Sequence, residues 1–158
     1  MINILVLCTG NSARSIMLES ILRHHAHDRV IAHSAGSNPA GDVNPVALQL
    51  LQSKGHDTRL LRSKSWDEYA RAPEMDMVIT VCGNAARETC PIWPGAPLRA
   101  HWGVDDPADP HIPVDSRPQA FDLAYHALLH RAKALLDMKF EEMSAGDLQH
   151  ALTDIGKV

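Results

Sequence analysis

A cysteine and an arginine near the N-terminus have the types and the spacing of an oxyanion-binding nucleophile. The segment VLCTGNSARS runs from Val6 to Ser15, so five small or polar residues separate Cys8 from Arg14. Small residues let the backbone curl with successive N–H groups inward, and such a nest beside a helix N-terminus binds a tetrahedral anion. The Arg14 guanidinium adds a forked donor for two oxygens. The predicted oxyanion-binding residues are Thr9, Gly10, Asn11, Ser12, Ala13 and Arg14.

The same loop favours the thiolate of Cys8. A free thiol, with a pKa of about 8.5, is mostly protonated at neutral pH, and lowering it by two units corresponds to roughly 2.7 kcal/mol. Inward N–H groups, the helix dipole and a hydroxyl proton from Ser15 would all stabilise the anion. Asn11 suits a left-handed turn and can bond to its neighbours. The plainer interpretation is a buried Cys8 beside a surface Arg14.

Alternating strands and helices must position this loop. Continuous apolar runs predict strands, and amphipathic periodicity predicts helices between them. The strands are expected at 2–8, 30–37, 75–82 and 98–102, and the helices at 14–26, 43–55 and 115–140.

This alternation predicts a three-layer α/β fold. A parallel sheet with helices on both faces follows from it, and we expect four strands in the order 2-1-3-4. Ligands bind at the carboxyl ends of such strands, at the switch point between the first and third strands. Those two strands end at Cys8 and Cys82.

Residue types mark the ends of several helices. Asn44 suits an N-cap, Pro45 a first helical position and Gly55 the residue after a helix. The stripe expected to be buried on the long helix is Phe121, Tyr125, Leu128, Ala132 and Leu135.

The chain is expected to form one domain, 1–140, followed by a helical tail, 141–158. In the tail, Ser144 and Asp147 resemble a capping box and Gly156 a stop. Leu148, Ala151, Leu152 and Ile155 follow a helical apolar pattern. We expect this helix to pack on its own domain rather than on a partner.

Composition narrows the class of protein. The chain has 158 residues, 45% of them apolar, and a net charge of −4. This charge argues against nucleic-acid or anionic-membrane partners, and no apolar run is long enough to span a membrane. The N-terminus lacks the features of a signal peptide, so a cytoplasmic location is expected. Three cysteines are too few for a disulfide scaffold, so they are buried fillers or reactive groups.

The placement of the three cysteines suggests thiol exchange. Adjacent strands lie about 4.8 Å apart and disulfide Cα pairs about 5.5–6 Å apart, so Cys82 can approach Cys8 if their strands are neighbours. Cys90 follows Cys82 by eight residues, which is about 12 Å along a helix. A Cys82–Cys90 disulfide would therefore require the segment GNAARET between them to unwind.

Plainer roles remain open for these residues. Cys82 could be a buried residue at a strand end and Cys90 a loop thiol. A zinc site from these cysteines and some of the ten histidines lacks zinc-finger spacing, so no metal site is expected. The segment HHAH at 24–27 is interpreted as a solvated helix end.

Several short motifs together resemble one family. They are CTGNSARS (8–15), SAGS (34–37), VNP (43–45), VITVC (78–82), CPIWPG (90–95) and HWGVDDPA (101–108), within residues 2 to about 140. This combination is similar to the arsenate reductases related to low-molecular-weight tyrosine phosphatases. The resemblance implies the phosphatase I fold, reduction of arsenate to arsenite in arsenic detoxification, and electrons from thiols rather than from a metal or nucleotide cofactor.

The resemblance also implies a general acid. The family's acid is the aspartate before the first proline of this loop, which is Asp106 here. Pro107 restricts the preceding residue to extended conformations, and the alternative role for Asp105 is to cap or orient the loop. The plainer interpretation is an acidic turn. The phosphatases usually carry tyrosine where this chain has Ala108, which weakens a phosphotyrosine interpretation.

Three functions follow as hypotheses. In the first, Cys8 attacks arsenate, Cys82 attacks Cys8 to release arsenite, and Cys90 attacks Cys82, with thioredoxin or glutaredoxin as the reductant. The second is a tyrosine phosphatase that uses Cys8, Arg14 and Asp106. The third is an oxyanion sensor that binds without chemistry.

Overall fold

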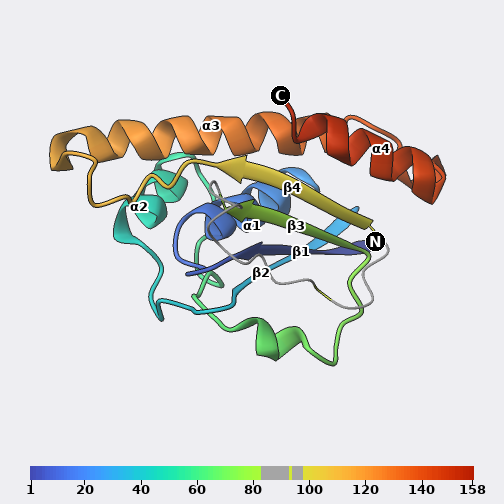
Figure 1. The fold of residues 1–158 in the computed structure, drawn as a ribbon, viewed down its shortest axis with the longest axis horizontal. Coiled ribbons are helices and arrows are strands. Elements are labelled where there is room, and N and C mark those ends of the chain that lie inside the picture. The colour runs from blue at the N-terminus through green and yellow to red at the C-terminus, as the bar shows by residue number, and fades with distance from the viewer. Residues whose placement is uncertain (83–92, 94–97) are drawn as a thin grey trace.

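The computed structural model describes residues 1–82, 93 and 98–158. Its centre is a four-stranded parallel sheet in the order β2-β1-β3-β4, which confirms the predicted order and fold class (Figure 1). The strands are β1 (Ile2–Cys8), β2 (Val30–Gly36), β3 (Met77–Cys82) and β4 (Leu98–Val104). Because the strands are parallel, the ends of β1 and β3 lie at the same edge of the sheet.

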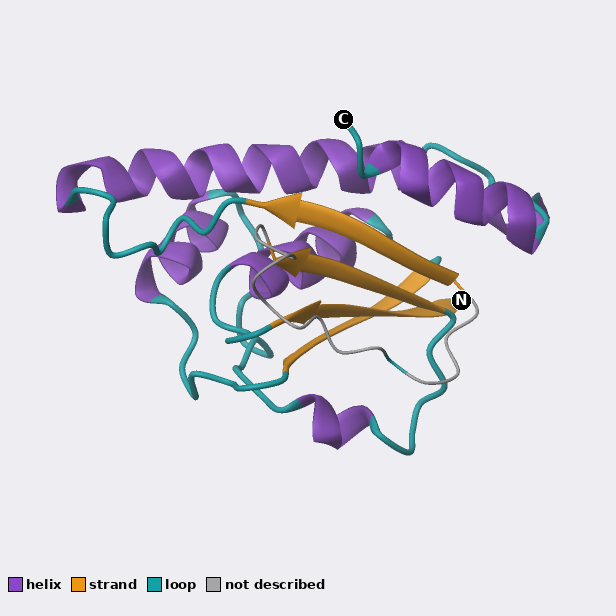
Figure 2. Ribbon diagram, in the orientation of Figure 1, coloured by secondary structure: helices purple, strands orange, loops and turns teal. Residues whose placement is uncertain are grey.

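The two faces of β1 serve two different cores. Successive strand residues point to opposite faces, so Ile4 and Val6 join the large core against the α-helices. Leu5 and Leu7 join a smaller core. That second face is covered by the segment carrying the 3-10 helix η1 (Trp66–Tyr69), with Met75 and Trp93 (Figure 2). Both faces of β1 are therefore buried, as its continuous apolar run predicted.

The helices are α1 (Arg14–His25), α2 (Pro45–Ser53), α3 (Arg117–Leu136) and α4 (Ala145–Ile155), with short 3-10 helices η2 (Val114–Ser116) and η3 (Phe140–Glu142). The α-helices other than α3 begin where the sequence signals predicted, whereas α3, expected from residue 115, begins at Arg117 after a short 3-10 helix. The Asn44 side chain accepts hydrogen bonds from the N–H groups of Val46 and Ala47, and Gly55 has a φ of 83°. The predicted apolar stripe of α3 is buried.

The end of α3 corrects one expectation. The periodicity predicted a helix through Phe140, but α3 ends at Leu136. The guanidinium of Arg29, at the start of β2, donates to the carbonyl oxygens of Leu136 and Met138. These bonds satisfy carbonyl groups at the helix end, so a distant residue caps a helix whose local sequence would continue it.

The tail packs on β4 (Figure 1). Trp102 is fully buried, and its indole N–H donates to the carbonyl oxygen of Leu152 at 3.1 Å. Gly156 has a φ of −65°, so it is not the left-handed stop that the sequence suggested. A Cβ at this position would lie 2.5 Å from the carbonyl oxygen of His101, so close approach to β4 is what requires glycine.

No helix in the described parts of the chain is both long enough and apolar enough to cross a membrane.

Candidate active site

The thiols of Cys8 and Cys82 meet at the carboxyl edge of the sheet. The register pairs Leu7 of β1 with Thr80 of β3, so the two strands end almost level. Both cysteines are buried and reduced. The Cys82 thiol makes a side-chain hydrogen bond with the Cys8 sulfur, and the Thr9 hydroxyl lies 4.0 Å from the Cys82 sulfur. The predicted juxtaposition of these two cysteines is therefore present.

This environment lowers the pKa of the Cys8 thiol to about 6. The largest cause is the hydrogen bond with Cys82, followed by the opposing effect of burial, which raises the pKa. The positive charge of Arg14 and the backbone N–H groups of Thr9 and Gly10 add to the lowering. A thiol with this pKa is mostly thiolate at neutral pH, which is the form that acts as a nucleophile.

The loop between Cys8 and α1 is held from outside through its carbonyl groups. The carbonyl oxygen of Thr9 accepts from the N–H of Asn38, that of Gly10 from Ala40, and that of Ser12 from Asn44, each at 2.9 Å. A loop whose carbonyl groups point outward can direct its N–H groups inward, as an anion-binding nest requires.

The packing of β2 against this loop requires a glycine. A Cβ at Gly36 would lie 2.4 Å from the Thr9 carbonyl oxygen and 3.0 Å from the Asn11 nitrogen. The glycine of the SAGS motif therefore lets β2 approach the loop backbone directly.

Asn11 fixes the loop from inside. It is fully buried, and its φ of 43° is the left-handed conformation that its residue type suggested. Its amide nitrogen donates to the hydroxyl oxygens of Ser15 at 2.8 Å and Ser34 at 2.9 Å. Its amide oxygen accepts the N–H of Lys64 at 2.9 Å. Because the Ser15 hydroxyl oxygen accepts a hydrogen bond from Asn11, the hydroxyl proton of Ser15 can be donated to another group. Its donation to the Cys8 sulfur stays a prediction.

Arg14 joins the loop to the end of β4. Its Nη1 donates to the carbonyl oxygen of Val104 at 3.0 Å. Its Nε is buried and has no hydrogen-bond acceptor in the described parts of the chain. A buried guanidinium N–H without an acceptor is costly, and an oxyanion in the loop would supply one. Ala13 offers no side-chain cap to the first turn of α1, whose N–H groups therefore also face the loop.

Asp106 lies two residues beyond the Val104 carbonyl group that Arg14 contacts. Its side chain is exposed and accepts the N–H of Ala108 at 2.9 Å, so this is also the acidic turn of the plainer interpretation. The exposed Asp105 lies beside it, and both line a surface pocket of about 310 Å³. The structure thus brings Asp106 to the same edge of the sheet as Cys8. Cys90 and the segment before it lie outside the described residues.

A buried ionic cluster behind the loop has no counterpart in the sequence predictions. Glu19 of α1 is fully buried; it accepts a hydrogen bond from the Ser34 hydroxyl and forms ion pairs with Arg23 at 2.8 Å and with Lys64 at 3.6 Å. Lys64 is itself buried, which lowers its pKa, while Glu19 opposes that lowering. The sequence feature that could have indicated this cluster is the carboxylate of Glu19, which lies within the apolar part of α1.

This cluster reaches the oxyanion loop through the Asn11 side chain. Ser34 and the backbone of Lys64 both bond to Asn11, and Asn11 bonds to Ser15. The Glu19 carboxylate therefore orders the groups that hold Asn11, without itself lying in the loop.

Comparison with known proteins gives the family. The model of the low molecular weight phosphotyrosine protein phosphatase family matches residues 3–145. An arsenate reductase of Halalkalibacterium halodurans is 40% identical over 102 residues, which is 65% of this chain and 71% of that protein.

Two solved structures agree in fold. An arsenate reductase from Archaeoglobus fulgidus superposes with a TM-score of 0.69 at 23% identity, over 85% of this chain and 99% of that one. A thioredoxin-dependent arsenate reductase of Corynebacterium glutamicum superposes with a TM-score of 0.52 at 24% identity, over 84% of this chain and 62% of that one. From its matched family model and its curated relatives, the chain belongs to the low molecular weight phosphotyrosine protein phosphatase family, among the arsenate reductases of that family.

Proposed function

We propose that this protein reduces arsenate to arsenite with a nucleophilic Cys8 and a relay of three thiols. The observation that carries the proposal is the second buried thiol, Cys82, which interacts with the first and lowers its pKa. A phosphatase needs one nucleophilic cysteine, whereas a two-electron reduction by thiols needs two. The curated relatives at about 40% identity are arsenate reductases, which supports the same chemistry.

The first step binds and activates arsenate. The anion would lie in the loop from Thr9 to Arg14, where the Arg14 Nε, which has no acceptor among the described residues, and a neighbouring Nη would form a fork for two oxygens. The Cys8 thiolate attacks arsenic and forms a sulfur–arsenic bond. The arsenic–oxygen bond opposite to the new sulfur–arsenic bond breaks. Asp106 donates a proton to that oxygen, which leaves as water.

The second step transfers the electrons. The Cys82 thiol gives its proton to an oxygen on arsenic as its sulfur attacks the Cys8 sulfur; the sulfur–arsenic bond breaks and its electron pair remains on arsenic. Arsenic goes from As(V) to As(III) and leaves as arsenite, while the two thiols are oxidised to a Cys8–Cys82 disulfide. Because the Cys82 side chain already interacts with Cys8 at neighbouring strand ends, we expect this step to need little movement.

The last steps restore the nucleophile. Cys90 attacks the Cys82 sulfur and frees Cys8 as thiolate, and an external dithiol reduces the Cys82–Cys90 disulfide. The thioredoxin-dependent relative from Corynebacterium glutamicum supports thioredoxin as that dithiol, and glutaredoxin is the other candidate. This chemistry would take place in the reducing cytoplasm.

A coupled assay tests the proposal. Arsenate-dependent oxidation of NADPH, with thioredoxin and thioredoxin reductase, should occur with the wild type and fall to background in Cys82→Ser and in Cys90→Ser. The same measurement with glutaredoxin, glutathione and glutathione reductase in place of the thioredoxin system shows which of the two proteins is the reductant. Equal rates in all three proteins would contradict the relay.

Phosphatase activity is the second candidate, because the matched family model is that of phosphotyrosine phosphatases. It requires Cys8, Arg14 and Asp106 only. Hydrolysis of an aryl phosphate that survives Cys82→Ser, with no arsenite formed by the wild type, would favour it. Binding of arsenate without either product would favour an oxyanion sensor.

A further inference from the structure

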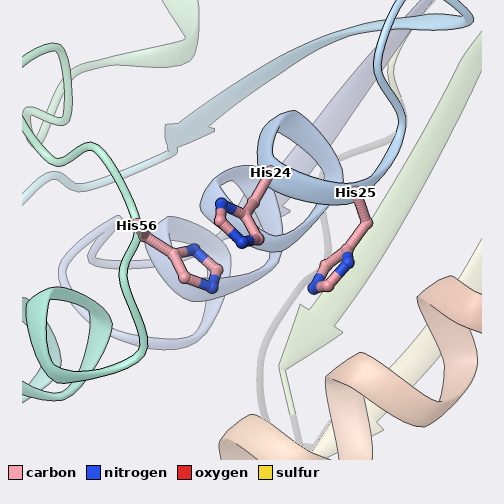
Figure 3. A group of neighbouring side chains, drawn as sticks. All are labelled: His24, His25 and His56. Carbon is pink, nitrogen blue, oxygen red and sulfur yellow. The ribbon is translucent and has the colours of Figure 1, made fainter.

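Three histidines gather at the end of α1 opposite to the oxyanion loop (Figure 3). His24 and His25 are the last two residues of α1, and His56 follows the left-handed Gly55 after α2. One ring nitrogen from each lies within 4.8 Å of the other two. From its first residue, Arg14, α1 extends about 18 Å, so this cluster is separate from the site around Cys8.

We propose that His24, His25 and His56 form a binding site for a divalent transition metal ion of the Zn²⁺ type. Neutral imidazole is a preferred ligand of Zn²⁺, Cu²⁺ and Ni²⁺, and three histidines with one open position are a known zinc ligand set. The three rings come from two separate segments of the chain, so the bound ion would join the end of α1 to the segment after α2.

The ring of His56 is oriented by two hydrogen bonds. Its Nδ1 lies 2.8 Å from the Ser20 hydroxyl and its Nε2 lies 2.9 Å from the Tyr125 hydroxyl. With Nδ1–H donating to Ser20, the lone pair of Nε2 is left to accept from Tyr125. A metal ion would take the place of the Tyr125 proton on Nε2, while Ser20 would keep the ring in the orientation and tautomer that ligation needs.

The other two rings can complete the geometry. The His24 ring is stacked on the His56 ring, with centroids 4.2 Å apart, and His25 meets His56 edge-on at 6.2 Å. Nitrogens bound to one tetrahedral Zn²⁺ at about 2.05 Å lie about 3.3 Å apart, so the ring nitrogens must move closer together by at most about 1.5 Å. His24 is exposed and His25 half-buried, so rotation of these two side chains can supply that movement.

The cluster is open to solvent on one side. A surface pocket of about 330 Å³ is lined by His24, by the Ser20 that orients His56, and by Asp57. The Asp57 carboxylate on the pocket wall is ion-paired with Arg59 at 2.8 Å. The pocket, which Arg23 also lines, gives an ion a path of entry from solvent to the exposed His24.

The test is a titration of the full-length chain with Zn²⁺ at pH 7, by calorimetry. The three cysteines are replaced by serine, because thiolates would bind Zn²⁺ themselves, and circular dichroism checks the fold. We expect one Zn²⁺ per chain and at least ten-fold weaker binding in His24→Gln and in His25→Gln. His150→Gln, which changes an exposed histidine of α4, should leave binding unchanged.

A second readout separates loss of a ligand from loss of the fold. Zn²⁺ should raise the melting temperature of the parent and of His150→Gln, and should not raise that of His56→Asn. Absence of binding, or binding that His24→Gln and His25→Gln leave unchanged, would overturn the site. Neither result bears on arsenate reduction, because the cluster lies at the other end of α1.

Discussion

The Cys82 thiol forms a hydrogen bond with the Cys8 sulfur across the ends of two neighbouring parallel strands. This contact stabilises the thiolate of the nucleophile and places the second thiol where a disulfide can form. The same pair of residues therefore serves both the attack on the substrate and the transfer of electrons.

The first prediction concerns the pKa of Cys8. Cys82→Ala removes the largest cause of its lowering, so the pKa should rise from about 6 by one unit or more. Cys82→Ser keeps an O–H donor at the same position and should leave the pKa closer to that of the parent. Alkylation of Cys8 by iodoacetamide as a function of pH, followed by mass spectrometry in a Cys90→Ser background, measures it. The same pKa in all three proteins would show that the contact does not stabilise the thiolate.

The second prediction concerns Asn11. Asn11→Ala removes three buried hydrogen bonds and keeps a Cβ at a φ of 43°, so we expect a loss of about 2–4 kcal/mol in the free energy of unfolding in urea. Asn11→Gly removes the same bonds but tolerates the backbone, and should be about 1 kcal/mol more stable than Asn11→Ala. Asn38→Ala, at an exposed loop position, is the matched control. Equal stability of Asn11→Ala and Asn38→Ala would rule out this role.

The sequence predicted the elements that local signals determine. The Asn44 cap, Pro45 and the left-handed Gly55 act within a few residues, so their types alone indicated the bounds of α2. The placement of Cys8 beside Cys82 followed from strand order, which the alternation of strands and helices restricts strongly.

What the sequence missed depends on contacts between distant segments. The carbonyl group of Leu136, at the end of α3, is bound by Arg29, more than a hundred residues earlier. Gly156 is needed because β4 lies against it, which no local pattern reveals. The pairing of Glu19 with Lys64 appears only once the segment after β2 is folded against α1.

The third prediction concerns that buried pair. Lys64→Met leaves the Glu19 carboxylate buried with Arg23 as its remaining ionic partner, so the free energy of unfolding should fall by about 2 kcal/mol or more. The double variant Glu19→Gln/Lys64→Met removes both charges and should recover part of this loss. Lys54→Met removes a more exposed ion pair with Asp122 and should cost less than about 1 kcal/mol. Glu19→Gln is also measured alone. If its effect and that of Lys64→Met add up to the effect of the double variant, Glu19 and Lys64 do not interact.

The fourth prediction concerns pH and stability. Burial, with the charges of His24 and His25, lowers the pKa of His56 from 6.5 to about 4. Between these values the unfolded chain binds a proton at His56 that the folded chain does not, so stability falls as the pH is lowered from 6.5 to 4. The full loss is at most about 3 kcal/mol at 1.36 kcal/mol per pKa unit.

Unfolding in urea at several pH values, with EDTA present, measures this loss. In His56→Asn the fall in stability between pH 6.5 and 4 should be smaller than in the wild type. His150→Gln should keep the slope of the wild type. A slope that His56→Asn leaves unchanged would mean that other groups carry the pH dependence.

The most direct test of the central claim is a single turnover of the Cys90→Ser variant with arsenate and no external reductant. Without Cys90 the relay stops after the second thiol, so the account predicts one arsenite per chain. It also predicts a disulfide between the peptides that contain Cys8 and Cys82. Arsenite formed without that disulfide, or no arsenite from a folded variant that binds arsenate, would contradict the account.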